Sequence, residues 1–125
     1  MANNLSAKGG ADQSSNDTNG VRDIFIRDRL ANTTSRINKT TNTLEIEDAS
    51  YSPIISNDGL YVVFESTSSY LSSEDTDNNN DVFRYSIANN EVALISLKSS
   101  GSKVLAHSGS ATISADGNII VFQSY

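Results

Sequence analysis

The sequence contains no cysteine and no tryptophan, and it has a single proline in 125 residues. Without cysteine the chain forms no disulfide and no thiolate zinc site, and it has no cysteine nucleophile. No apolar run approaches the ~18–20 residues that a membrane-spanning helix needs, so no membrane segment is expected. Residues 1–10 lack a charged start followed by an apolar core, so we expect no signal peptide there.

Positive charge is also scarce. Nine Lys and Arg residues stand against fifteen Asp and Glu, which gives a formal net charge of -6. The nine are scattered along the chain and form no basic stripe, so nucleic acid is an unsuitable partner. Apolar residues make up 37%, below the usual ~45–50%, which favours a small β-structure with long loops or a core completed by another chain.

An internal repeat with a period of 58 residues runs through the chain. When residues 23–66 are aligned with residues 81–124, 13 of the 44 positions are identical and no gap is needed. The identities fall on turn residues and on apolar strand residues, as in Ile55–Gly59 against Ile113–Gly117. A gapless match at both kinds of position indicates a structural repeat. A plain β-sandwich with accidental self-similarity is the alternative.

Each repeat is predicted to form four short antiparallel strands. In the complete copy they cover residues 53–56, 60–66, 81–87 and 91–97, with a polar loop at 67–80. The Asp58-Gly59 pair between apolar β-forming residues is a strong hairpin signal, because this turn needs positive φ. No segment shows sustained helical periodicity, so the chain is predicted to be all-β. Four strands per repeat are typical of a β-propeller blade.

The motif residues extend this prediction to a family. Residues Ser52–Ser66 read Ser-x-x-Ile-Ser-x-Asp-Gly-x-x-Val-x-Phe-x-Ser, and the loop Asp75–Asp77 and Asp81–Phe83 follow them. This pattern resembles the TolB-like (WD40-like) β-propeller repeat of bacterial proteins, and it covers the chain from about residue 17. It departs at Ala111, where proline is usual, as at Pro53. The resemblance implies a six-bladed propeller in the periplasm or outside the cell, but no particular activity.

The repeat boundaries divide the chain into half a blade, a full blade and half a blade. We expect a loop at residues 1–16, strands three and four of a blade at 17–40, a complete blade at 41–98, and strands one and two of another blade at 99–125. A half blade has an exposed strand edge, so head-to-tail pairing between copies is predicted. Three chains would close a six-bladed ring, and four would close an eight-bladed one. A fragment of a longer chain is the alternative explanation.

The loop from Asp75 to Asp81 is a candidate calcium site. Oxygen-bearing side chains recur at alternate positions, at Asp75, Asp77, Asn79 and Asp81. Calcium takes roughly six to eight oxygen ligands, which a short acidic loop supplies. In the first copy Val21 replaces one of these side chains, so weaker binding or none is expected there. Turn capping by Asp and Asn side chains is the alternative role for the loop.

Catalysis is not predicted. His107 is the only histidine, and adjacent residues of an extended chain point to opposite sides, so His107 and Ser108 are not expected to form a catalytic pair. In a closed ring, residues near strand one would line the central channel. A ligand-binding mouth is therefore predicted at Glu47, Asp48, Tyr51, His107 and Ser108.

These observations predict a non-catalytic propeller module that binds or scaffolds a protein or glycan and assembles with itself. One alternative is a non-catalytic propeller segment of a larger enzyme, such as a peptidase or lyase. Another is an engineered or excised fragment with no activity beyond assembly. The residues do not identify the ligand.

Overall fold

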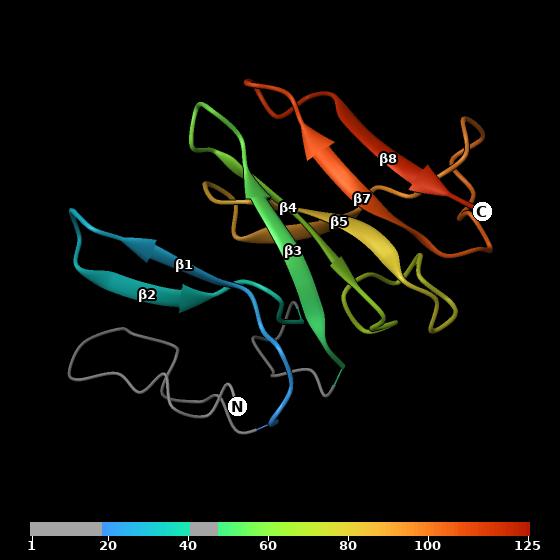
Figure 1. Ribbon diagram of the computed structural model, residues 1–125, viewed down its shortest axis with the longest axis horizontal. Coiled ribbons are helices and arrows are strands. Elements are labelled where there is room, and N and C mark those ends of the chain that lie inside the picture. Colours follow the sequence, from blue (N-terminus) through green and yellow to red (C-terminus); the bar gives the residue numbers. More distant parts are fainter. Residues whose placement is uncertain (1–18, 41–47) are drawn as a thin grey trace.

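A computed structural model describes residues 19–40 and 48–125, and this part of the chain is all-β, as predicted (Figure 1). Among these residues no helix is long and apolar enough to cross a membrane. The strands are β1 (Phe25–Asp28), β2 (Thr33–Arg36), β3 (Ser50–Ile55), β4 (Tyr61–Ser66), β5 (Asp81–Ser86), β6 (Glu91–Leu94), β7 (Ser108–Ile113) and β8 (Ile120–Ser124).

The strands form three antiparallel sheets that follow one another along the chain. β1 and β2 form a hairpin, β3 to β6 form a four-stranded sheet in the order β3-β4-β5-β6, and β7 pairs with β8. The central sheet lies between the two hairpins (Figure 1). No sheet closes on itself among the described residues, so the closed propeller stays a prediction.

Strand β4 of the central sheet is buried on both faces, because its alternate residues face opposite sides and pack against different hairpins. Val62 and Phe64 belong to an apolar cluster that includes Ile24 and Ile37 beside the β1–β2 hairpin. Val63 belongs to a second cluster, which is completed by apolar residues of β7 and β8. The central sheet therefore packs against a different hairpin on each side.

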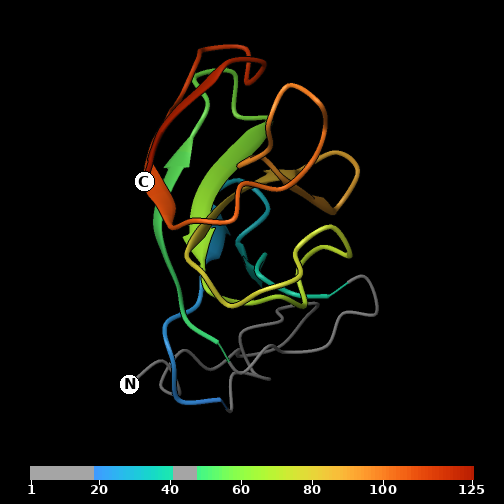
Figure 2. The same cartoon turned by 90° about the vertical axis from the view of Figure 1, so that its right-hand side faces the viewer.

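The repeat in the sequence is also a repeat of hydrogen bonds. In the β3–β4 turn the Ser56 hydroxyl donates to Asp58 Oδ1 at 2.6 Å. In the β7–β8 turn the Ser114 hydroxyl donates to Asp116 Oδ1 at 2.8 Å. The glycine after each aspartate has positive φ, as the Asp-Gly signal requires. The two turns lie side by side, and the backbone N–H of Asp58 donates to a carbonyl of the second turn (Figure 2).

Strand β3 begins earlier than predicted, because it contains a bulge. The prediction placed it at residues 53–56, whereas it spans Ser50–Ile55. The register shifts between Tyr51 and Ile54, so β3 carries one more residue than the part of β4 that it pairs with. Ser52 in this bulge has a φ of 57°, and its equivalent in the bulge of β7, Ser110, has a φ of 52°.

Candidate functional site

The acidic loop between β4 and β5 folds back on itself through its own side chains. Asp75 Oδ1 accepts the backbone N–H of Asp77 at 3.3 Å, and Asp77 Oδ1 accepts that of Asn79 at 2.8 Å. Asp81, the first residue of β5, is fully buried, and its Oδ1 accepts the hydroxyl of Ser96 at 2.7 Å. The turn capping that the sequence suggested is therefore present.

The carboxylates of Asp75, Asp77 and Asp81 converge, with one oxygen of each within 4.8 Å of the others. The ammonium of Lys103 lies among them. Its Nζ is 3.4 Å from Asp75 Oδ1, 2.9 Å from Asp77 Oδ1 and 2.8 Å from Asp81 Oδ2. Lys103 comes from the connection between β6 and β7, so this cluster ties that connection to the acidic loop.

The pKa values of the groups in this acidic cluster are shifted in different directions. Burial by itself lowers the pKa of Lys103, but hydrogen bonds to Asp81 and Asp77 and the nearby charges outweigh burial and raise that pKa above its usual value. The hydrogen bond from Lys103 holds the pKa of Asp77 below its usual value. Burial raises the pKa of Asp75, whose buried Oδ2 has no hydrogen-bond partner among the described residues.

The fit of a calcium ion to this cluster depends on Lys103. Converging carboxylates are the ligands that a hard cation prefers. However, the Lys103 ammonium already provides the positive charge between them, so a divalent ion would have to displace it. Asn79, the remaining predicted ligand, contributes its backbone N–H to Asp77. Calcium at this loop stays a prediction, and Lys103 is the residue that the sequence analysis missed.

The first copy of the repeat holds its strand-entry aspartate differently. Asp23 Oδ1 accepts the Asn38 amide at 2.6 Å, and Asn38 Oδ1 in turn accepts the backbone N–H of Ile24 at 2.8 Å. The guanidinium of Arg36 lies 3.6 Å from Asp23 Oδ2. Asp17, the first acidic residue of this loop, lies outside the described residues.

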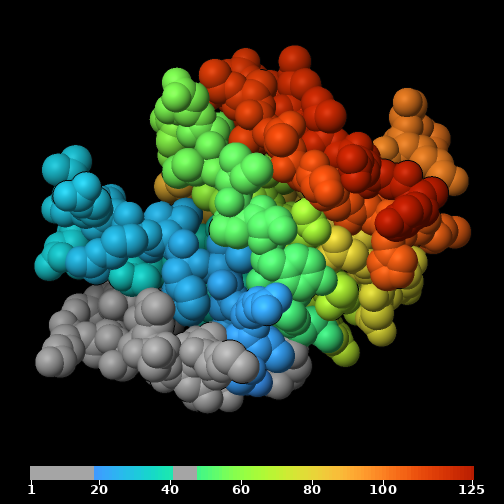
Figure 3. Space-filling view, in the orientation of Figure 1, coloured from blue at the N-terminus to red at the C-terminus, as the bar shows by residue number. Residues whose placement is uncertain are grey.

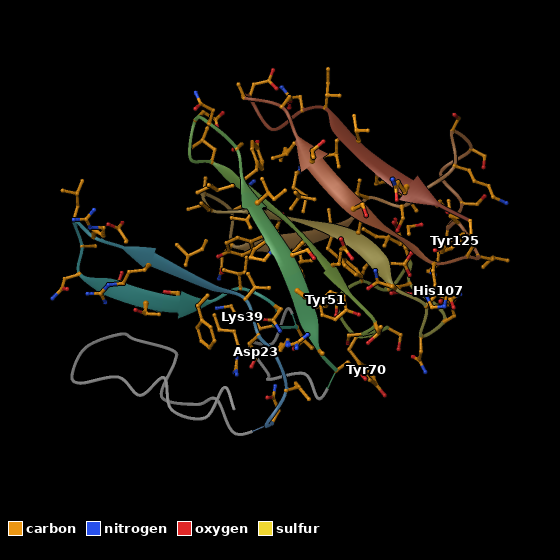
Figure 4. The ribbon with its side chains drawn as sticks, in the orientation of Figure 1. Asp23, Lys39, Tyr51, Tyr70, His107 and Tyr125 are labelled. Carbon is orange, nitrogen blue, oxygen red and sulfur yellow. The ribbon has the colours of Figure 1, made fainter. Side chains whose placement is uncertain are left out.

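A second feature is a pocket of about 430 Å³ between the central sheet and the β7–β8 hairpin. Its lining comes from β4, the acidic loop, β7 and the end of β8: Glu65, Asn80, His107, Ser108, Gly109, Ser110, Gln123, Ser124 and Tyr125. Figure 4 shows His107 and Tyr125 near one another on one side of the molecule, and the backbone N–H of Tyr125 donates to the His107 carbonyl at 3.2 Å.

Among the described residues, Glu65 is the only acidic side chain that lines the pocket. Its side chain is almost fully buried, and it joins three parts of the chain. Oε2 accepts the Asn80 amide at 2.9 Å, and Oε1 accepts the backbone N–H of Ser110 at 2.8 Å. Asn80 also donates to the Ser108 carbonyl at 2.8 Å. These hydrogen bonds hold the carboxylate in a defined position.

Two of the five residues predicted to form a ligand mouth, His107 and Ser108, line this pocket. Asp48 and Tyr51 do not line it. Tyr51 lies in β3 opposite Glu65 rather than in a loop, and burial together with the Glu65 charge raises the pKa of its hydroxyl. Glu47 lies outside the described residues. The predicted ligand mouth stays a prediction; the pocket contains two of its five residues together with Glu65, which the sequence did not indicate.

The side chains of His107 and Ser108 have different hydrogen-bond partners. The backbone N–H of Asn80 donates to His107 Nδ1 at 2.9 Å. The hydroxyl of Ser108 is directed to Ser124 Oγ, at 3.1 Å, and to the carbonyl of Ala106. Among the described residues, no hydrogen bond joins the His107 imidazole to the Ser108 hydroxyl, and the absence of catalysis stays a prediction.

Comparisons of the chain with models of protein families, with curated proteins and with solved structures gave no match.

Proposed function

We propose that this chain is a non-catalytic β-propeller module of the TolB-like type, which binds or scaffolds a partner and completes its last blade by head-to-tail pairing with a second copy. The central sheet β3–β6 is one blade in this proposal. The β7–β8 hairpin supplies strands one and two of the next blade, and the β1–β2 hairpin supplies strands three and four of the preceding one.

Strand β8 carries this proposal, because it has the sequence of an interior strand and the surroundings of an edge strand. Its residues Val121 and Phe122 are the repeat equivalents of Val63 and Phe64 in β4, which are fully buried. Val121, in contrast, is 64% exposed, and Ile119 just before the strand is 66% exposed. Figure 3 shows the C-terminal segment, in red, at the surface. An apolar edge strand of this kind tends to pair with another strand.

The free edges of β8 and β1 are complementary. In the central sheet, β4 pairs with β3 on one side and with β5 on the other. Among the described residues, β8 pairs only with β7, and β1 pairs only with β2. Because β1 is the repeat equivalent of β5, the β4–β5 register predicts how β8 meets β1 of a second copy. Phe122 would face Phe25, as Phe64 faces Phe83 with ring centroids 5.8 Å apart.

The two faces of such a completed blade would also be covered. Phe122 already packs toward the central sheet of its own chain. Val121 points the other way, where the central sheet of the second copy would lie. Three chains joined in this way would give the six blades that the TolB-like resemblance implies, and four chains would give eight.

Native mass in solution, measured by light scattering on a sizing column, tests this proposal. We expect a discrete species of three chains, or of four. Val121→Lys should shift it to a single chain, because the ammonium would be buried between sheets. Leu30→Lys is the matched control, since Leu30 is fully exposed in the β1–β2 turn and away from the predicted contact. A wild-type monomer at all concentrations, or an unchanged mass for Val121→Lys, would refute head-to-tail pairing.

A further inference from the structure

The pocket beside β7 has the chemistry of a binding site for an organic cation. We propose that it takes a primary ammonium group, with Glu65 as the countercharge. The proposal names a ligand for the binding module described above. It rests on that module being non-catalytic but does not depend on head-to-tail assembly, so the two are tested by different measurements.

The charged side chain in the pocket lining is negative. Glu65 supplies a carboxylate, and no lysine or arginine of the part of the chain that the structure describes lines the pocket. Within residues 19–40 and 48–125, Glu65 forms no ion pair, and the partners of its oxygens are the neutral N–H groups of Asn80 and Ser110. A buried carboxylate with only neutral partners is stabilised further by a cation.

The absence of a side chain at Gly109 leaves room for the Glu65 carboxylate. A Cβ atom at Gly109 would lie 2.8 Å from Glu65 Oε2 and 3.2 Å from Asn80 Nδ2, so any other residue would push these side chains away. In the other copy of the repeat the same position is occupied by Tyr51. The pocket is therefore specific to this junction between sheets, and it is not a general consequence of the repeat.

The position of Asn80 also distinguishes the two junctions. The same backbone hydrogen bond occurs at both junctions. The N–H of Ser108, at the start of β7, donates to the Asn80 carbonyl at 2.6 Å. The N–H of Ser50, at the start of β3, donates to the Arg22 carbonyl at 2.7 Å. The first junction thus carries arginine where the second carries asparagine. The chain thus has a residue with a cationic side chain at the first junction and a neutral one at the second, where the proposed ligand would supply the cation.

One carboxylate selects a monovalent cation. A divalent metal ion needs several anionic or carbonyl oxygens, and here both carboxylate oxygens already accept N–H groups. An anion is repelled by Glu65. An ammonium group donates hydrogen bonds to the remaining lone pairs of the carboxylate, and the exposed ring of Tyr125 at the rim is suited to cover an organic cation. The volume of about 430 Å³ is that of a small-molecule site.

The ammonium group has two natural sources, a free amine and a lysine side chain of a partner protein. Titration with n-butylammonium and with Nα-acetyl-lysine amide distinguishes them, and 1-butanol and Nα-acetyl-norleucine amide are the neutral controls. The backbone amide resonances of Gly109 and Ser110 report binding, because the Ser110 N–H contacts Glu65 directly. We expect saturable shifts with at least one amine, and binding of its neutral counterpart weaker by about tenfold or more.

Two variants test the role of the carboxylate. Glu65→Gln should weaken amine binding by about tenfold, since it removes a charged hydrogen-bond acceptor. Because this change also loosens contacts within the fold, Gln123→Glu provides an independent test. Gln123 is exposed on the pocket wall, so a second carboxylate there should strengthen amine binding by roughly threefold without unfolding the chain.

Equal shifts with the amine and its neutral counterpart would overturn the proposal, as would unchanged affinity in Gln123→Glu. Native mass measured in the same samples separates this outcome from failure of assembly. A monomer that binds amine supports the pocket proposal alone, whereas an oligomer that ignores amine supports assembly alone.

Discussion

The two copies of the repeat hold the same aspartate by different means. Asp81 opens β5 and meets an ammonium from a distant connection, at 2.8 Å from Lys103 Nζ. Asp23 precedes β1 and meets the Arg36 guanidinium of its own hairpin at 3.6 Å. The cation of the central copy therefore comes from the connection between two sheets, while the Arg36 cation comes from the same hairpin as the aspartate it meets. Both copies of the repeat keep the aspartate. The residue that provides its cation, Arg36 or Lys103, determines which part of the chain the aspartate is joined to.

The largest contrast between the copies should come from Phe64 and Phe122. Phe64→Ala should cost about 3–5 kcal/mol of unfolding free energy, because Phe64 is fully buried. Phe122→Ala should cost about half as much at low protein concentration, since Phe122 is only partly buried. Chemical denaturation over a range of protein concentrations measures both. If blades are completed between copies, the cost of Phe122→Ala should rise with concentration toward that of Phe64→Ala; a cost that stays constant would argue against completion.

Lys103→Met should destabilise the protein by about 3 kcal/mol, because it leaves converging buried carboxylates without their cation. Lys103→Arg is the control that keeps the charge. We also expect calcium to raise the thermal midpoint of Lys103→Met more than that of the wild type, since the competing ammonium is gone. Differential scanning calorimetry with calcium and with a chelator measures this difference. An equal response of the two proteins would mean that Lys103 does not compete with the ion.

Alanine substitutions at the equivalent turn glycines, Gly59 and Gly117, should differ by a smaller amount in unfolding free energy. Gly59 and Gly117 have nearly equal φ values of 74° and 76°, so alanine strains both backbones alike. A Cβ at Gly117 would lie 2.1 Å from the Tyr61 ring, which is also stacked under the Arg84 guanidinium, whereas a Cβ at Gly59 meets nothing within 4 Å. Gly59→Ala should cost about 1 kcal/mol and Gly117→Ala about 1–3 kcal/mol more. Equal losses in denaturant unfolding would show that the two hairpins do not touch here.

The smallest expected effect concerns pH. The folded-state pKa of Asp77 is lowered, first by its hydrogen bond from Lys103. Its contribution to stability is therefore complete above the usual aspartate pKa of about 3.9 and is lost as the pH falls through the folded-state value. Asp77→Asn should flatten this part of the stability–pH curve by less than about 1 kcal/mol, because Asp77 is partly exposed. Urea unfolding between neutral pH and acidic pH measures the difference, and identical curves would contradict it.

Much of the fold could be predicted, because the repeat marks turns as well as strands. The Asp-Gly turns, the order of the strands and the all-β class follow from short-range signals. The early start of β3 could not be predicted in the same way. Its first residues, Ser50 and Tyr51, pair with β4 and are separated from the rest of β3 by a bulge. Pro53 lies in this bulge, and the sequence pattern placed the start of the strand there.

The candidate sites were predictable only where their residues are close in sequence. Asp75, Asp77 and Asp81 share one loop, so their convergence could be inferred from spacing. Lys103 lies more than twenty residues further on, and its position in the first copy is held by Glu45, so the repeat gave no warning. A signal for the pocket was present in Gly109, which replaces Tyr51, but its meaning depends on which side chain of the neighbouring sheet approaches it.

The bulge shared by β3 and β7 has a consequence for how this molecule can diverge. Tyr51 in β3 and Gly109 in β7 are the last residues that pair in register before the bulge. The serine that follows each of them has a left-handed backbone conformation. The residue at that position can be a tyrosine or a glycine while the hydrogen bonds on either side stay in register. The surface at each junction between sheets can therefore change through this one position without a change in strand register.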